Sequence, residues 1–137
     1  MKDTNLKRKR DADLYQTYLR GLEGGCFANA SQAAEYVTKQ PAPQFYISSR
    51  EINLHIGKIQ SGTSLIYLNS MSRKRVWQLY DNYLRYLSEH PDTKLSRERI
   101  LEILVEEPAP EYYLSWQAAR QILRREIKKR RMKWTDK

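Results

Sequence analysis

The sequence predicts an all-α protein made of two tandem three-helix units, each with a long Pro-Ala-Pro loop before its third helix. Residues 41–48 (PAPQFYIS) recur as residues 108–115 (PAPEYYLS), with five identities in eight positions. Residues 8–22 match residues 73–87 at nine of fifteen positions, whereas unrelated sequences of ordinary composition would share about one. Apolar residues near these blocks recur every three or four positions, which is the period of a helix. We therefore interpret the chain as an internal duplication.

The repeat sets the predicted boundaries. A unit of about 65 residues is only marginally stable alone, so we expect the two units to pack together or to share a long helix. The predicted segments are a flexible N-terminus over 1–7, helical unit 1 over 8–60, a linker over 61–72, helical unit 2 over 73–131 and a basic C-terminal tail over 132–137.

The first two helices of unit 1 are predicted from an apolar stripe and from their ends. The first helix spans residues 8–23, and Gly24-Gly25 ends it. The second helix follows Asn29, which has the residue type and the spacing of an N-cap. It ends before Pro41, because the residue preceding a proline is disfavoured in the α region. The stripe of the first helix is Leu14, Tyr15, Tyr18, Leu19 and Leu22.

The third helix of unit 1 follows the Pro-Ala-Pro loop. Residues 45–47 are expected to run extended and to bury their rings. Ser48 then caps the helix, with Glu51 at the capping-box position. The linker that follows has polar ends and an apolar centre over 65–68. We expect an exposed connection whose centre packs along one of the units.

Unit 2 repeats this arrangement. Pro91 ends its first helix, Ser96 caps its second helix, and Ser115 caps its third helix. The first helix again has an apolar stripe, formed by Val76, Leu79, Tyr80, Tyr83, Leu84 and Leu87.

The composition points to a polyanionic partner. The net charge is +9 and the isoelectric point is near 9.7, which favours nucleic acid or an acidic membrane surface as a partner. A single cysteine excludes an intramolecular disulfide and fits a reducing cytoplasm. The basic N-terminus is not followed by an apolar segment, and no apolar stretch approaches the length of a membrane span. We expect a cytoplasmic protein that does not enter a membrane.

Residue patterns typical of catalysis are nearly absent. His55 and His90 lie far apart in the sequence, and neither has metal-ligand spacing with Cys26. They are most simply a polar helix residue and a residue at a helix C-terminus. We therefore expect no enzymatic activity, no metal and no cofactor.

Two basic triplets open the first helices of the units in this prediction. Cations at a helix N-terminus oppose the helix dipole, and both copies of the repeat keep them, so we interpret the triplets as phosphate-binding residues. The alternative is that they are solubilising residues inherited from one segment. The triplets are Arg8, Lys9, Arg10 and Arg73, Lys74, Arg75.

The third helices are the candidate DNA-reading elements. Arg, Asn and Gln make bidentate contacts to base edges in the major groove, and a capped third helix resembles the recognition helix of helix-turn-helix modules. Ordinary surface positions are the alternative, and the Pro-Ala-Pro loop is longer than a helix-turn-helix turn. The predicted base-reading residues are Arg50, Asn53, Gln117, Arg120, Gln121 and Arg124. Lys128, Lys129 and Arg131 extend the basic C-terminal helix, which carries most of the net charge.

Two functions remain open at this stage. The first hypothesis is a non-enzymatic DNA-binding protein with two helix-turn-helix-like units, such as a small regulator of transcription, replication or recombination. The second hypothesis is a helical adaptor or structural protein that binds an acidic partner, or nucleic acid without sequence specificity. The composition also permits RNA binding. The sequence leaves the target site and the oligomeric state open.

Overall fold

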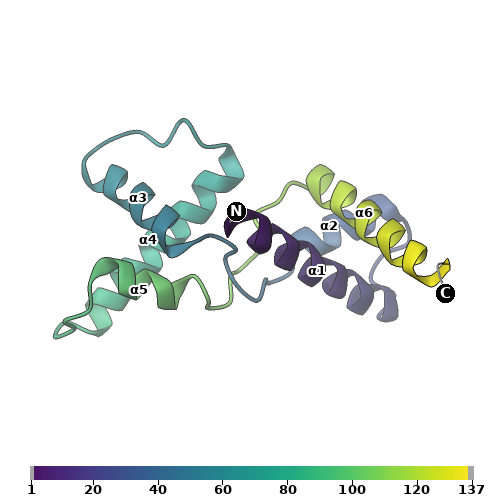
Figure 1. Cartoon of the computed structure of the whole chain (residues 1–137), viewed down its shortest axis with the longest axis horizontal. Coiled ribbons are helices and arrows are strands. Elements are labelled where there is room, and N and C mark those ends of the chain that lie inside the picture. The colour runs from purple at the N-terminus through teal and green to yellow at the C-terminus, as the bar shows by residue number, and fades with distance from the viewer. Residues whose placement is uncertain (1, 136–137) are drawn as a thin grey trace.

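The computed structural model is all-helical, as the sequence predicts, and contains no strand within the part of the chain that it describes. It describes the backbone of residues 2–135 and the side chains of residues 5–131. The helices are α1 (Lys2–Glu23), α2 (Ala30–Thr38), α3 (Ser49–Gln60), α4 (Ser70–Glu89), α5 (Arg97–Leu104) and α6 (Trp116–Thr135) (Figure 1).

Side-chain caps place most of these helix starts where the sequence predicts them. Asn29 and Ser48 each accept a hydrogen bond from the backbone N–H three residues later. Ser96 and Ser115 do the same for α5 and α6. Asn69 caps α4 through the backbone N–H of Ser72, which the prediction missed because it placed the start of this helix later.

Two predicted boundaries change. The segment expected to be flexible over 1–7 is helical from Lys2, and α4 takes in the last residues of the predicted linker. Neither basic triplet therefore opens its helix, since both follow the first turn, where the effect of the helix dipole is strongest. The helix dipole therefore gives no reason to assign phosphate binding to the triplets. The predicted tail over 132–137 lies outside the described side chains.

The helices pack into two bundles that exchange their third helices. In one bundle α6 packs on α1 and α2, and in the other α3 packs on α4 and α5. The backbones of helices from different bundles do not approach each other in the described part of the chain. Figure 1 shows the bundles side by side, joined by the crossing loops. The bundles therefore do not coincide with the predicted units 8–60 and 73–131.

The two Pro-Ala-Pro loops cross at an antiparallel bridge. The N–H of Ala42 donates to the carbonyl of Ala109, and the N–H of Ala109 donates to the carbonyl of Ala42, both at 2.9 Å. Both alanines are buried. The prolines on either side hold the backbone extended, so each loop continues across the bridge into the other bundle and does not turn back.

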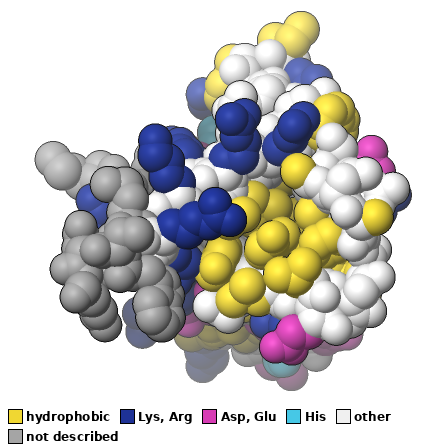
Figure 2. All heavy atoms as spheres, turned by 90° about the vertical axis from the view of Figure 1, so that its right-hand side faces the viewer, with side chains coloured by type: hydrophobic (Ala, Val, Ile, Leu, Met, Phe, Trp, Pro, Cys, Tyr) yellow, Lys and Arg dark blue, Asp and Glu magenta, His cyan; other side chains and the backbone are white. Residues whose placement is uncertain are grey.

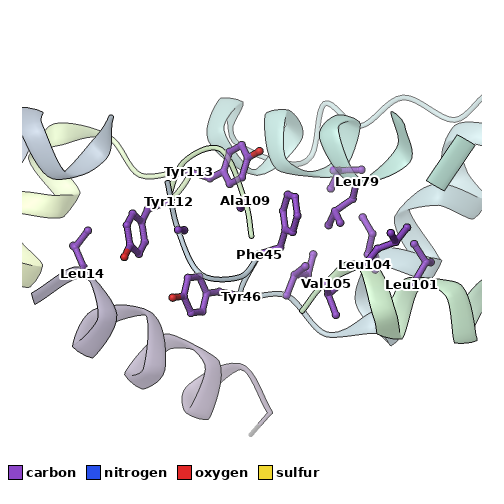
Figure 3. Packing of buried hydrophobic residues seen from close by; sticks show 14 of the residues in the cluster. Leu14, Phe45, Tyr46, Leu79, Leu101, Leu104, Val105, Ala109, Tyr112 and Tyr113 are labelled. Carbon is purple, nitrogen blue, oxygen red and sulfur yellow. The ribbon is translucent and has the colours of Figure 1, made fainter. Parts of the chain in front are cut away.

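Aromatic rings fill the crossing. Phe45 stacks on Tyr113 and Tyr46 stacks on Tyr112, each with ring centroids 6.0 Å apart. The repeat relates these two pairs, because residues 45 and 46 correspond to residues 112 and 113. Figure 3 shows the four rings between Leu14 of α1 and the leucines of the α4–α5 side. One apolar core therefore runs through both bundles.

Both loops bend at the same position. Tyr46 has φ of 56° and Tyr113 has φ of 58°, in the left-handed region that non-glycine residues rarely occupy. The expectation that 45–47 run extended is thus wrong at Tyr46. Such a conformation costs about 1–3 kcal/mol, and the burial of both rings offsets it. The bend turns the chain from the bridge into the following helix.

The linker packs on the bundle that it leads into. Leu65 is buried, as expected for its apolar centre, whereas Ile66 is 79% exposed. Tyr67 lies over α3, where its hydroxyl is 2.7 Å from His55 Nδ1 and its ring is 4.3 Å from Lys58 Nζ.

The exchange of third helices predicts that the protein survives a cut in its linker. A protease site inserted between the exposed residues Gly62 and Ser64 divides α1–α3 from α4–α6, yet each bundle draws helices from both fragments. After cleavage we expect the two fragments to elute together in size-exclusion chromatography at the volume of the uncut chain, with unchanged helical circular dichroism. Separation of two folded fragments without denaturant would contradict the exchange.

Candidate nucleic-acid interface

The outward face of α6 is the most basic surface that the predicted site residues form. Ala119, Ile122 and Leu123 are buried against α1 and α2, so the helix turns its remaining side to solvent. All seven predicted site residues of α6 lie on that exposed side. They are Gln117, Arg120, Gln121, Arg124, Lys128, Lys129 and Arg131.

These residues form one continuous strip. A spacing of three or four positions places five of them along one side of the helix: Gln117, Arg120, Arg124, Lys128 and Arg131. Gln121 and Lys129 lie beside this line, and the strip is about 21 Å long at 1.5 Å per residue. Four of its cations form no ion pair with any described residue: Arg120, Arg124, Lys128 and Lys129. By contrast, Arg125 pairs with Asp11 at 3.6 Å and Arg130 pairs with Glu126 at 3.4 Å.

Only two residues of the first basic triplet are free to contact a phosphate. Arg8 and Lys9 are exposed on α1, which packs beside α6. Arg10 is half-buried and donates two hydrogen bonds to Asp11, at 3.0 and 3.1 Å. The preceding residue, Lys7, is also exposed, and sequence reasoning missed it because it lies outside the repeated block.

All three residues of the second basic triplet make contacts within the protein. Arg73 donates to the carbonyl of Leu68 at 3.1 Å, and Lys74 forms an ion pair with Glu111 of the second crossing loop. Arg75 donates to the carbonyl of Tyr46 in the first crossing loop at 3.2 Å. Lys74 and Arg75 therefore fasten α4 to the two crossing loops, and Arg73 fastens it to the linker, which gives all three a structural role that the sequence pattern does not reveal.

Helix α3, the third helix of the first repeat, presents fewer exposed polar side chains at its predicted site positions than α6 does. Arg50 is exposed, but Asn53 accepts a hydrogen bond from Arg97 Nε at 2.6 Å and thereby joins α3 to α5. The structure therefore places the predicted residues of α6 in one bundle with Arg8 and Lys9, and it places Arg50 and Asn53 in the other bundle.

A cavity of about 590 Å³ lies where the two bundles meet. Lys7, Arg10 and Arg75 contribute cations to its wall, and Glu51 contributes a carboxylate. Two of these three cations already donate to protein oxygens, as described above. The cavity thus has less uncommitted positive charge than α6.

The tyrosines of the crossing have raised pKa values. Burial, followed by a hydrogen bond to Asp13, raises the pKa of Tyr46 above its ordinary value. Burial and the nearby Glu111 carboxylate raise the pKa of Tyr113 to about 12. Burial also raises the pKa of Tyr112, whose hydroxyl lies 2.8 Å from that of Thr17. The buried hydroxyl of Tyr113 makes no hydrogen bond to a described residue.

The histidines sit as the sequence analysis describes them. His55 belongs to α3 and contacts Tyr67, and His90 ends α4 with its backbone N–H donating to the carbonyl of Tyr86. Within residues 5–131, no three His, Cys, Asp or Glu side chains gather in a way that suits a metal ion. Among the described helices, none combines the length and the apolar composition needed to cross a bilayer.

Comparison of the chain with protein-family models, with curated proteins and with solved structures finds no match.

The crossing predicts unequal effects on stability for two equivalent tyrosines. Tyr46→Phe removes a hydrogen bond to Asp13 and should lower the free energy of unfolding by about 1–3 kcal/mol at pH 7. Tyr113→Phe removes a hydroxyl without a partner, so we expect a change smaller than about 0.5 kcal/mol. Urea unfolding followed by circular dichroism measures both values. Equal losses would contradict the assigned hydrogen bonds.

The same tyrosines predict alkaline sensitivity. Because their pKa values are higher in the folded protein than the ordinary value near 10, the unfolded chain loses these protons first. The stability they contribute is complete below pH 10 and declines as the pH rises toward 12. Tyr113→Phe should make this decline shallower in unfolding measurements between pH 9 and pH 11.5. An unchanged decline would show that Tyr113 does not contribute to it.

Proposed function

We propose that the protein is a non-enzymatic DNA-binding protein in which α6 enters the major groove and α1 and α2 support it. The observation that carries this proposal is the exposed strip of α6, in which four cations lack ion-pair partners among the described residues. The major groove is about 12 Å wide and admits one α-helix. A third helix held by two others is also how helix-turn-helix proteins present their recognition helix.

The two ends of the strip have different chemistry. Gln117, Arg120, Gln121 and Arg124 lie in the first half of α6, and Gln and Arg side chains hydrogen-bond to adenine and guanine edges. Lys128 and Lys129 lie further along and suit phosphates, where a point charge is sufficient. We therefore assign base contacts to the N-terminal half of α6 and backbone contacts to the following turns.

Helix α1 supplies the second set of phosphate contacts in this proposal. In helix-turn-helix complexes the supporting helix crosses the DNA backbone, and α1 packs along α6. Its exposed cations Arg8 and Lys9 suit that position.

A single reading helix is favoured over a symmetric pair. In the repeat, Leu54 and Gly57 of α3 occupy the positions of Gln121 and Arg124 of α6. Asn53 corresponds to Arg120 and is already bonded to Arg97. The α3–α4–α5 bundle thus lacks most of the groups that α6 presents.

We also infer that the two halves descend from one duplicated segment. The repeated sequence blocks, the paired ring stacks and the two equivalent bends support this inference. Both loops cross in the same way. We therefore infer that the exchange of third helices arose before α3 and α6 came to differ in sequence.

The proposal predicts salt-sensitive binding to duplex DNA that depends on α6. In an electrophoretic shift assay we expect binding at 50 mM salt and a loss of roughly a hundredfold or more at 200 mM salt. Arg120→Ala and Arg124→Ala should each weaken binding by about 1–3 kcal/mol and relax the preference for particular bases. Lys128→Ala should weaken binding to all duplexes alike and reduce the salt slope by about 1.

Arg85→Ala is the matched control, because Arg85 is an exposed cation on α4 outside the proposed interface. It removes the same charge and should leave binding nearly unchanged. Absence of duplex binding at 50 mM salt, or equal losses for Arg85→Ala and Arg124→Ala, would exclude α6 as the reading helix.

A further inference from the structure

The free end of the α1–α2–α6 bundle has an exposed apolar surface. Figure 2 views the molecule from this side and shows an apolar patch with Lys and Arg side chains gathered along one edge. Leu22, near the end of α1, is 52% exposed. Four half-buried rings continue the surface as a row of contacts, and we call this set the aromatic row. It consists of Tyr15, Tyr18, Phe27 and Tyr36.

The aromatic row is fixed in place by close packing of α1 and α2. Successive ring centroids lie 5.9, 5.5 and 5.7 Å apart. A Cβ added at Gly21 would come within 2.6 Å of Tyr36 and 2.8 Å of Phe27, so the rings lie directly against the α1 backbone. Glycine at this position permits that approach. The row is therefore a preformed surface and does not require rearrangement before a partner binds.

Cations from two helices flank the aromatic row. The Arg130 guanidinium lies 4.2 Å from the centre of the Tyr15 ring, which links the row to the last turns of α6. Lys129, the residue before Arg130, is exposed and forms no ion pair with a described residue. Arg20 is an exposed cation of α1. A partner on this surface would meet apolar groups in the middle and positive charge along one side.

We propose that this end of the bundle binds an acidic amphipathic helix of a partner protein. Its apolar side chains would lie on Leu22 and the aromatic row, and its carboxylates would face Lys129, beside Arg130. Helices bind apolar grooves through side chains at i, i+3, i+4 and i+7, and charge complementarity sets their orientation. This inference goes beyond the proposed DNA binding and does not depend on it.

Nucleic-acid bases and lipids fit this surface less well. Single-stranded nucleic acid stacks its bases on free ring faces, but the Tyr18 and Phe27 rings already stack on each other at 20°. Leu22 supplies aliphatic surface, which offers no stacking. A membrane would favour cations around the whole patch, whereas they gather along one edge in Figure 2.

Calorimetric titration of the full chain with two designed peptides tests the proposal. One peptide, about 18 residues long, has Leu and Phe at helical spacing and Glu on one flank; the second replaces each Glu with Lys. We expect the acidic peptide to bind at least tenfold more tightly than the basic one. Leu22→Ser should weaken acidic-peptide binding about fivefold. The matched control Leu54→Ser removes a leucine that is 64% exposed on α3 and should leave binding unchanged.

Several results would overturn the proposal. These are equal binding of both peptides, equal effects of Leu22→Ser and Leu54→Ser, or Leu22-dependent binding of oligothymidylate or phosphatidylserine vesicles that exceeds binding of the acidic peptide. Duplex DNA binding measured on Leu22→Ser separates the two proposals, since Leu22 lies outside the α6 strip. We expect that variant to lose peptide binding and to retain DNA binding.

Discussion

The crossing of the two Pro-Ala-Pro loops is the constraint on which the rest of the structure depends. Two reciprocal hydrogen bonds between Ala42 and Ala109 and two pairs of stacked rings join the loops. Prolines keep the chain extended on both sides of the bridge, so each third helix packs in the bundle formed by the other half of the chain. The basic helix α6 comes to lie on α1 and α2 for this reason.

The two bundles also differ in the charged side chains that they expose. Helix α6 runs to Thr135 with an exposed basic side, whereas α3 ends at Gln60 and bonds to α5 through Asn53. The two basic triplets differ in the same sense, because only the first keeps exposed cations that make no hydrogen bond or ion pair with a described residue. Arg8 and Lys9 stay exposed beside α6, while Arg73 and Lys74 hold the linker and the second crossing loop. We therefore place the proposed functions in the α1–α2–α6 bundle and a supporting role in the other.

The sequence predicts the helices well because their determinants are local. Asn29, Ser48, Ser96 and Ser115 act as caps where their residue types and spacing place them. The exchange could not be predicted, because the apolar stripes of the two first helices are nearly the same and the sequence pattern does not show on which pair of helices each third helix packs. The roles of the charged residues depend on that choice. Only the arrangement in space shows that Lys74 meets Glu111 while Arg124 meets no described acid.

The most direct test of the exchange is a nuclear Overhauser spectrum of the intact protein. The Arg130 guanidinium lies 4.2 Å from the centre of the Tyr15 ring, and Arg97 Nε lies 2.6 Å from the side-chain oxygen of Asn53. The structure predicts cross-peaks between the Tyr15 ring and the Arg130 side chain, and between the side chains of Asn53 and Arg97. Cross-peaks from the Tyr15 ring to α3, with none to α6, would show that each repeat keeps its own third helix and would contradict the exchange.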